Sequence, residues 1–88
     1  MTYVYMLRCG DGSLYTGWTN DLAASLAAHQ AGRGGKYTRS HLPVELVYYE
    51  LLPTRHEAIG RERQIKAQRR TEKQALISEK EKQSNETN

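Results

Sequence analysis

Two short segments rich in aromatic and β-branched residues open the chain, and the turn between them constrains the fold more than any other feature. The segments are residues 3–8 and 14–18, and the sequence CGDGS separates them. Apolar segments joined by Gly and Asp in this way are typical of a β-hairpin. The sequence therefore predicts two antiparallel strands at the start of the chain.

The spacing around this turn determines which side chains face each other. A turn centred near Asp11 pairs Tyr5 with Gly17, and directly opposed residues share a face of the sheet. Tyr5 and Tyr15 then point to the same side, next to the open space that Gly17 leaves. Strand tyrosines are commonly core residues with a bonded hydroxyl, so a structural and a functional role for the pair both stay open.

Helices and one more strand follow the hairpin. The sequence TND precedes an Ala/Leu-rich helix that Gly32 ends, and residues 32–39 form a flexible basic loop. Residues 44–51 form a third strand, residues 55–70 a long helix, and Thr71 caps a shorter helix that ends near Lys80. The order β-β-α-β-α-α predicts a mixed α/β (α+β) fold. We expect a single domain at residues 1–80 and a polar, disordered tail at residues 81–88.

Length and composition exclude several classes of protein. A chain of 88 residues holds material for one small core, and its first apolar run ends at Arg8, far short of a membrane span. We therefore expect no membrane partner. The single cysteine, Cys9, forms no disulfide within the chain, and three scattered histidines make a poor zinc site. These features favour a reducing, cytoplasmic setting.

Positive charge is concentrated in the second half of the chain. The formal net charge is +3, and basic and acidic residues balance up to Glu50, so the excess comes entirely from the residues that follow. The densest basic stretch is residues 61–73. A basic helix is typical of a protein that binds a phosphate backbone, and it is also compatible with an ordinary solvated helix face.

Both long helical segments carry polar residues on faces that should be apolar. On the first, Ser25 and His29 share the stripe of the leucines. On the later one, Glu62 lies on the partly apolar side, where an ionised carboxylate is costly unless it is paired. An ion pair with Lys66 would account for Glu62 and contribute about 0.2–0.5 kcal/mol. A metal-ligating or catalytic carboxylate is the alternative.

An ordered set of motifs resembles the GIY-YIG endonuclease superfamily, in particular its small single-domain YhbQ-like members. The chain contains VY, YTG, TNDL, HQAG, KYTR and ERQIK in the order and at the spacing of that group, over residues 2–77. A tripeptide alone is not specific, whereas the ordered set is. The resemblance implies a three-stranded antiparallel sheet flanked by helices, in agreement with the element order above.

The resemblance also implies metal-dependent hydrolysis of a phosphodiester bond in nucleic acid, in the first place DNA, as in repair or exchange of strands. Tyr5, Tyr15 or His29 would orient and deprotonate the attacking water. Glu62 would hold one Mg²⁺ (or Mn²⁺) ion through its carboxylate and several waters. The residues expected to grip the substrate backbone or stack on a base are Gly17, Arg33, Lys36, Tyr37, Arg39 and Lys66.

Ser25 departs from the family pattern. Members of the family normally carry an arginine one turn before the His29 position, and a hydroxyl cannot neutralise phosphate charge as a guanidinium does. Losing such an arginine costs on the order of 10³ or more in rate. Either Arg33 or Arg39 supplies the missing charge, or the chain is a slow nuclease, or it has become a binding module.

Three functions therefore stay open. The first is a metal-dependent endonuclease, and the second is a catalytically impaired nucleic-acid-binding module, which would bind with steep salt dependence and never cut. The third is a protein-interaction domain whose basic helix docks on an acidic partner. The sequence leaves open the choice between DNA and RNA, the structure of the substrate, the cleavage specificity, the pathway and the oligomeric state.

Overall fold

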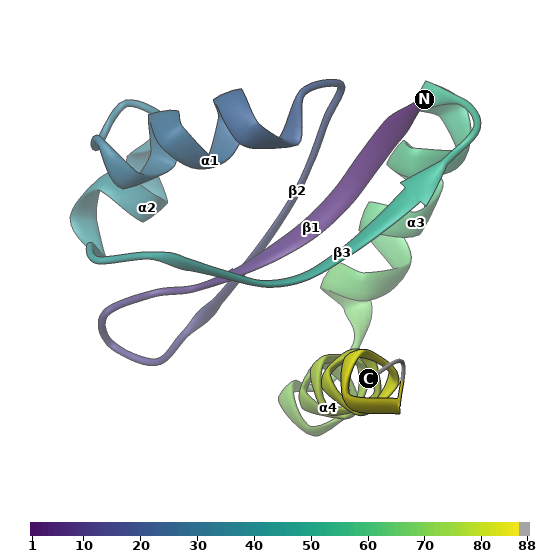
Figure 1. Cartoon of the computed structure of the whole chain (residues 1–88). Helices are drawn as coiled ribbons and strands as arrows, with labels where there is room; N and C mark the ends of the chain where they lie inside the picture. Colours follow the sequence, from purple (N-terminus) through teal and green to yellow (C-terminus); the bar gives the residue numbers. More distant parts are fainter. Residues whose placement is uncertain (87–88) are drawn as a thin grey trace.

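The computed structural model describes the backbone of residues 1–86 and the side chains of residues 1–81. A three-stranded antiparallel sheet in the order β2-β1-β3 lies between helices (Figure 1), so the predicted α+β fold is confirmed. The elements are β1 (Thr2–Arg8), β2 (Leu14–Thr19), α1 (Leu22–Gln30), α2 (Lys36–Ser40), β3 (Glu45–Leu52), α3 (Arg55–Ala67) and α4 (Arg70–Glu86).

The hairpin of β1 and β2 forms in the predicted register. Tyr5 pairs with Gly17 across the two strands. In the turn, the Asp11 carboxylate accepts a hydrogen bond from the backbone N–H of Ser13 at 3.0 Å, and Gly12 has a φ of 86°. Glycine adopts this left-handed conformation without strain. Because β1 also pairs with β3, Tyr5 is held in the central strand of the sheet.

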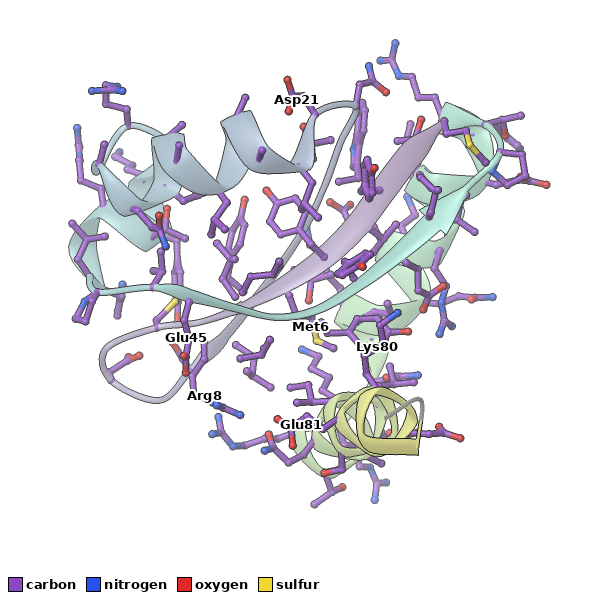
Figure 2. The ribbon with its side chains drawn as sticks, viewed as in Figure 1. Met6, Arg8, Asp21, Glu45, Lys80 and Glu81 are labelled. Atoms are coloured by element: carbon purple, nitrogen blue, oxygen red, sulfur yellow. The ribbon has the colours of Figure 1, made fainter. Side chains whose placement is uncertain are left out.

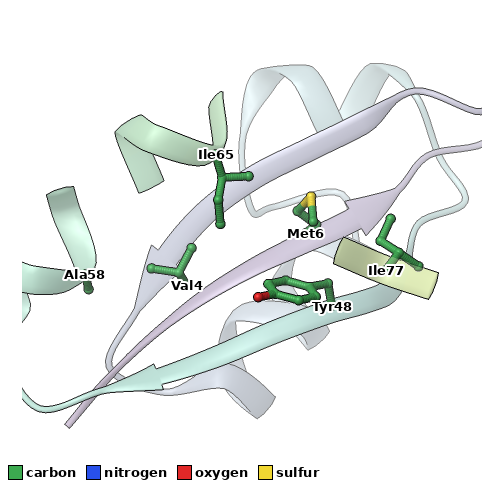
Figure 3. Close-up of a cluster of buried hydrophobic side chains, with 6 residues drawn as sticks. All are labelled: Val4, Met6, Tyr48, Ala58, Ile65 and Ile77. Atoms are coloured by element: carbon green, nitrogen blue, oxygen red, sulfur yellow. The ribbon is translucent and has the colours of Figure 1, made fainter. Parts of the chain in front are cut away.

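Helices cover both faces of the sheet. In Figure 1, α1 and α2 lie on one side of the strands, and α3 and α4 lie on the other. Successive residues of β1 alternate between the two faces, so each face has its own core. The core on the α3 and α4 side (Figure 3) consists of Val4, Met6, Tyr48, Ala58, Ile65 and Ile77. The core on the α1 side consists of Tyr5, Leu7, Cys9 and Val44.

The prediction of a flexible loop over residues 32–39 is wrong, because α2 occupies the end of that segment and continues to Ser40. This helix has a single turn, and helices this short are not stable on their own. Its buried residue is Thr38, which has no exposed surface. Tertiary contacts therefore stabilise α2, and they leave no signal in the local sequence.

The break between the last two helices also differs from the prediction. The long helix ends at Ala67, because Gln68 turns to extended backbone. Thr71 is not the cap of the next helix: α4 already includes it, and the backbone N–H of Arg69 donates to the Glu72 carboxylate at 2.8 Å. A carboxylate in the first turn that accepts a hydrogen bond from the backbone N–H just before the helix gives that N–H a partner, which the helix itself does not supply.

The last helix is longer than predicted. It passes Lys80 and continues to Glu86, so the expected disordered tail is helical at residues 81–86, while residues 87 and 88 lie outside the described part of the chain. Neither Gly nor Pro occurs in residues 81–86 to end the helix. Within residues 1–86, no helix is both long and apolar enough to cross a membrane.

An ion pair joins β3 to α3 on the side of the sheet that α4 also covers. The guanidinium of Arg61 donates to the Glu50 carboxylate from two nitrogens, at 2.8 and 2.9 Å, and the Tyr48 hydroxyl donates to the same carboxylate. Burial raises the pKa of Glu50, but the hydrogen bonds from Arg61 and Tyr48 outweigh it, so that the pKa lies below its usual 4.5. The pair therefore stabilises the fold while Glu50 is ionised.

We expect Glu50→Gln to lower the free energy of unfolding by about 1–3 kcal/mol at pH 7. A carboxylate whose pKa is lowered by folding contributes stability above its unfolded pKa, here 4.5, and this contribution is lost as the pH falls through the folded-state pKa. Urea unfolding at a series of pH values should show the difference from wild type shrinking as the pH falls below 4.5.

The matched control for this experiment is Glu45→Gln. Glu45 pairs with Arg8 at 3.3 Å beside α4 (Figure 2), and the Glu45 side chain is 66% exposed. Exposed pairs of this kind contribute about 0–1 kcal/mol, so the control should change stability little at any pH. A constant difference between Glu50→Gln and wild type at all pH values would contradict the account of Glu50.

Candidate active site

A buried tyrosine lies at the centre of a hydrogen-bonded cluster on the α1 face of the sheet. Tyr5 is 3% exposed, and its hydroxyl lies 2.9 Å from Nε2 of His29 and 3.2 Å from Oγ of Ser25. Ser25 and His29 are the two polar residues on the inward stripe of α1. Their place among the leucines is explained, because both side chains bond to Tyr5.

Gly17 makes room for the Tyr5 hydroxyl. A Cβ added to Gly17 would lie 2.7 Å from Oη of Tyr5 and 3.3 Å from Cε2 of Tyr15. A Cβ cannot come that close to the hydroxyl oxygen without displacing it. The Tyr5 hydroxyl therefore occupies the space beside Gly17 that the register predicts. We call Tyr5, Tyr15, Gly17, Ser25 and His29 the tyrosine–histidine cluster.

Burial keeps the aromatic groups of the cluster neutral. It raises the pKa of Tyr5 and of Tyr15, and it lowers the pKa of His29 below the usual 6.5. The ring of Tyr15 is half-buried, with its centroid 5.3 Å from that of His29. At neutral pH, His29 is therefore an uncharged imidazole in hydrogen-bond contact with a phenol.

Glu62 approaches this cluster from α3, on the opposite face of the sheet. Its side chain is 16% exposed, and its negative charge raises the pKa of both Tyr5 and Tyr15 further. Nζ of Lys66 lies 3.6 Å from the Glu62 carboxylate, in the i, i+4 pair that the sequence offered as an alternative. Because the Lys66 side chain is itself 55% exposed, it does not close the Glu62 carboxylate off from solvent.

Three cations expected to bind substrate gather around one hollow in the surface. Arg33, Lys36 and Arg39 line a pocket of about 210 Å³ together with Gly32 and Gly35. We call these five residues the basic pocket. Within the described side chains, none of the three cations forms an ion pair. Their charge is therefore available to an anionic ligand.

Tyr37 lies next to the basic pocket and is already engaged within the protein. Its ring stacks on His41 with 4.2 Å between centroids, and its hydroxyl donates to Oγ of Ser13 at 2.6 Å. Ser13 belongs to the turn of the hairpin, so Tyr37 ties α2 to that turn. The ring is 42% exposed, and stacking on a base, as the sequence suggested, would use the surface that these contacts leave free.

Thr38 is the member of the site that the sequence analysis did not single out. Its Oγ1 lies 2.7 Å from Nδ1 of His29, on the side of the imidazole opposite Tyr5. The residue occurs within the KYTR motif, of which only Lys36, Tyr37 and Arg39 were expected to bind substrate. Periodicity could not mark Thr38 as inward-facing, because α2 has only one turn.

The structure is thus a small α+β domain with a tyrosine from each hairpin strand beside a helical histidine. The model of the GIY-YIG catalytic domain matches residues 1–75, and the chain belongs to the GIY-YIG family of nucleases.

Relatives of the chain come from bacteria and archaea. It is similar to the UPF0213 protein CPE1444 of Clostridium perfringens, with 52% identity over 80 residues that cover 91% of this chain and 86% of that protein. The UPF0213 protein HQ_3675A of Haloquadratum walsbyi is 48% identical over 77 residues, covering 88% and 86%. The solution NMR structure of the UPF0213 protein BH0048 from Bacillus halodurans matches with a TM-score of 0.58 and 42% identity, over 89% and 84% of the two chains.

GIY-YIG nucleases generally depend on a divalent metal ion, and Glu62 is the residue that fits one. The described residues contain no group of three or more His, Cys, Asp or Glu side chains that could enclose a metal. Mg²⁺ commonly binds through one or two carboxylates and keeps several waters. Glu62 is a single, mostly buried carboxylate, and among the described side chains its ion-pair partner is the exposed ammonium of Lys66, which suits that mode of binding.

Proposed function

We propose that this protein is a metal-dependent endonuclease that hydrolyses phosphodiester bonds in nucleic acid, in the first place DNA. The observation that carries the proposal is the buried contact between Oη of Tyr5 and Nε2 of the neutral His29 at 2.9 Å. A phenol bonded to an uncharged imidazole can pass its proton to the ring and then accept one from water. Membership of the GIY-YIG family supports the same reaction.

Tyr5 and His29 together act as the general base in this proposal. Tyr5 gives its proton to Nε2 of His29 as it takes one from the attacking water. The water oxygen forms a bond to phosphorus, and the bond to the leaving oxygen on the opposite side breaks. The leaving oxygen takes a proton from solvent. Because burial raises the pKa of Tyr5 and lowers that of His29, the proton stays on Tyr5 until the attack begins.

Tyr15 and Glu62 have supporting roles in this proposal. The ring of Tyr15 contacts His29 and limits where a phosphate can lie, so we assign Tyr15 to orienting the water. Glu62 would hold the divalent ion, Mg²⁺ or Mn²⁺, which supplies positive charge to the phosphate when it is bound. The reaction belongs in the cytoplasm, since a lone buried thiol such as Cys9 suits a reducing compartment.

The basic pocket binds the phosphate backbone in this proposal. We expect Lys36→Gln and Arg39→Gln each to weaken DNA binding and to reduce the slope of log Kd against log salt concentration by about 1. The rate at saturating DNA should stay close to that of wild type, because neither cation bonds to Tyr5 or His29. Fluorescence anisotropy at several salt concentrations measures both quantities.

A matched control for the pocket is Lys80→Gln. Lys80 lies on the α4 side of the molecule (Figure 2), where its Nζ is 4.5 Å from the centre of the Tyr49 ring. If the basic pocket carries the binding, Lys80→Gln leaves the salt slope unchanged. Equal losses for Lys80→Gln and Arg39→Gln would point to diffuse attraction by the whole surface instead.

We expect Ser25→Arg to raise the rate of cleavage about 10-fold or more, because a positive charge would then stand beside the phosphate. Oγ of Ser25 lies 3.2 Å from the Tyr5 hydroxyl, so an arginine here would start at the edge of the tyrosine–histidine cluster. A single-turnover cleavage assay with Mg²⁺ measures the rate. An unchanged rate would mean that Ser25 does not limit the reaction.

The experiment that tests the proposed function is a nicking assay on single-stranded, duplex and branched DNA, with Mg²⁺ and with a chelator. Cleavage that the chelator abolishes supports the endonuclease. The second candidate, a binding module, is favoured by Ser25 in place of the family arginine. It predicts salt-dependent binding with no cleavage even when protein exceeds DNA. Absence of both binding and cleavage would favour the protein-interaction domain.

A further inference from the structure

Both ring nitrogens of His29 are occupied by hydroxyl groups from different parts of the fold. Nε2 lies 2.9 Å from Oη of Tyr5 in β1, and Nδ1 lies 2.7 Å from Oγ1 of Thr38 in α2. His29 is 2% exposed and Thr38 has no exposed surface, so water does not compete for these bonds. The tautomer of a neutral imidazole is set by the partner of each nitrogen, and here the partners are two hydroxyls.

The chemistry of the two hydroxyls indicates which of them donates to the imidazole of His29 and which accepts from it. A phenol is a stronger acid than an aliphatic alcohol, so Tyr5 is the better donor to an imidazole nitrogen. Thr38 has a backbone acceptor of its own, since its hydroxyl donates to the Gly35 carbonyl at 3.4 Å. Its oxygen is then free to accept from Nδ1–H of His29. Tyr5 in turn accepts from Ser25, whose hydrogen bond lowers the pKa of the phenol against the effect of burial.

The loop between α1 and α2 is shaped to bring Thr38 to this ring. A Cβ on Gly34 would overlap the imidazole of His29, so only glycine allows the chain to pass so close. On the other side of Thr38, the neighbouring Tyr37 anchors α2 to Ser13 in the hairpin turn. Nδ1 of His41 also bonds to the Tyr37 carbonyl, at 2.7 Å. These contacts determine the position of the Thr38 hydroxyl.

We propose that Thr38 is a positioning residue that holds His29 in the Nδ1–H tautomer, so that Nε2 is the atom that takes the proton of Tyr5. The inference rests on the proposed function, because it assigns Thr38 a role in that reaction. As the proton moves from Oη to Nε2, the ring becomes an imidazolium whose Nδ1–H still donates to Oγ1. Thr38 therefore stabilises the charged ring without touching substrate.

The test compares wild type with Thr38→Val and Thr38→Ser in the full chain. Valine keeps the branched shape of threonine and removes the hydroxyl, whereas serine keeps the hydroxyl. Long-range ¹H–¹⁵N NMR of the free protein identifies the tautomer of His29, and its backbone spectrum reports whether each variant is folded. Cleavage rates from pH 5 to 9 supply the second readout.

We expect the Nδ1–H tautomer in wild type and in Thr38→Ser, and a mixture of tautomers in Thr38→Val. Thr38→Val should lower kcat about 10- to 100-fold, the cost of removing the hydrogen-bond partners that orient histidine ligands in metal sites, with KM nearly unchanged. Without an acceptor for Nδ1–H the imidazolium is less stable, so the acidic limb of the pH profile, where His29 loses its proton, should move to lower pH.

Several results would overturn the assignment. An Nε2–H tautomer in wild type contradicts it directly and needs no variant to be folded. An unchanged rate and pH profile for a folded Thr38→Val variant contradict the role of Thr38 while leaving the proposed function intact. Failure of wild type to cleave any DNA with Mg²⁺ or Mn²⁺ contradicts the proposed function itself, and the role of Thr38 with it.

Discussion

Glu62→Gln should reduce metal-dependent cleavage by at least about 10³-fold, because a divalent ion contributes several kcal/mol of charge stabilisation in such reactions. The amide has nearly the shape of the carboxylate but carries no charge to hold the ion. The Glu62 side chain is only 16% exposed and contacts Lys66 through a single ion pair at 3.6 Å. Because the Lys66 side chain is 55% exposed, solvent screens the pair, and stability should change by less than about 1 kcal/mol.

Three measurements check this prediction. A single-turnover assay follows the cleavage rate, calorimetry follows Mg²⁺ or Mn²⁺ binding, and thermal unfolding follows stability. The matched control is Glu79→Gln, which removes an exposed carboxylate from α4 and should change none of the three. Cleavage by Glu62→Gln at the wild-type rate, or equal cleavage by wild type with and without chelator, would contradict the assigned role of Glu62.

Tyr5→Phe should lower the cleavage rate by about 10²–10⁴-fold, the usual contribution of a general base. The substitution removes the hydroxyl that bonds to His29 and Ser25 and leaves the ring in the core of the α1 face. Loss of a buried hydrogen bond costs about 0.5–1.5 kcal/mol, so the variant should fold. DNA binding measured with chelator present should equal that of wild type.

Tyr49→Phe is the control for this variant. Tyr49 lies directly opposite Tyr5 on β3, and it is 40% exposed. Its hydroxyl has no part in the proposed reaction, so cleavage should stay at the wild-type rate. If Tyr5→Phe cuts normally and Tyr15→Phe does not, Tyr15 is the base and the assignment of the two tyrosines is reversed.

Local features of the sequence were sufficient for the elements that carry the site. The pairing of Tyr5 with Gly17 followed from the position of the turn, and the start of α1 followed from Asp21, whose carboxylate accepts from the N–H of Ala24 at 3.1 Å. Helical spacing placed Ser25 and His29 on one stripe. Each inference needed only residues within one hairpin or one helix.

Features that depend on packing between elements could not be predicted in this way. The sequence KYTRS has no property that distinguishes a single helical turn from a loop, so α2 and the inward position of Thr38 were missed. The break between the last two helices was predicted two or three residues too late, and α4 was predicted too short, because no glycine or proline marks either end. The pair of Glu50 and Arg61 could not be predicted, since the sequence does not give the relative position of β3 and α3.

The sequence by itself determined the register of the hairpin, the polar stripe of the first helix and the family, because these follow from turn length, helical period and motif order. Only the tertiary structure decided that Tyr5, Ser25, His29 and Thr38 form one hydrogen-bonded chain. The contacts span 20, 24 and 9 residues and join β1, α1 and α2. Hydroxyl and imidazole groups bond only within about 3 Å, and packing of separate elements sets distances on that scale.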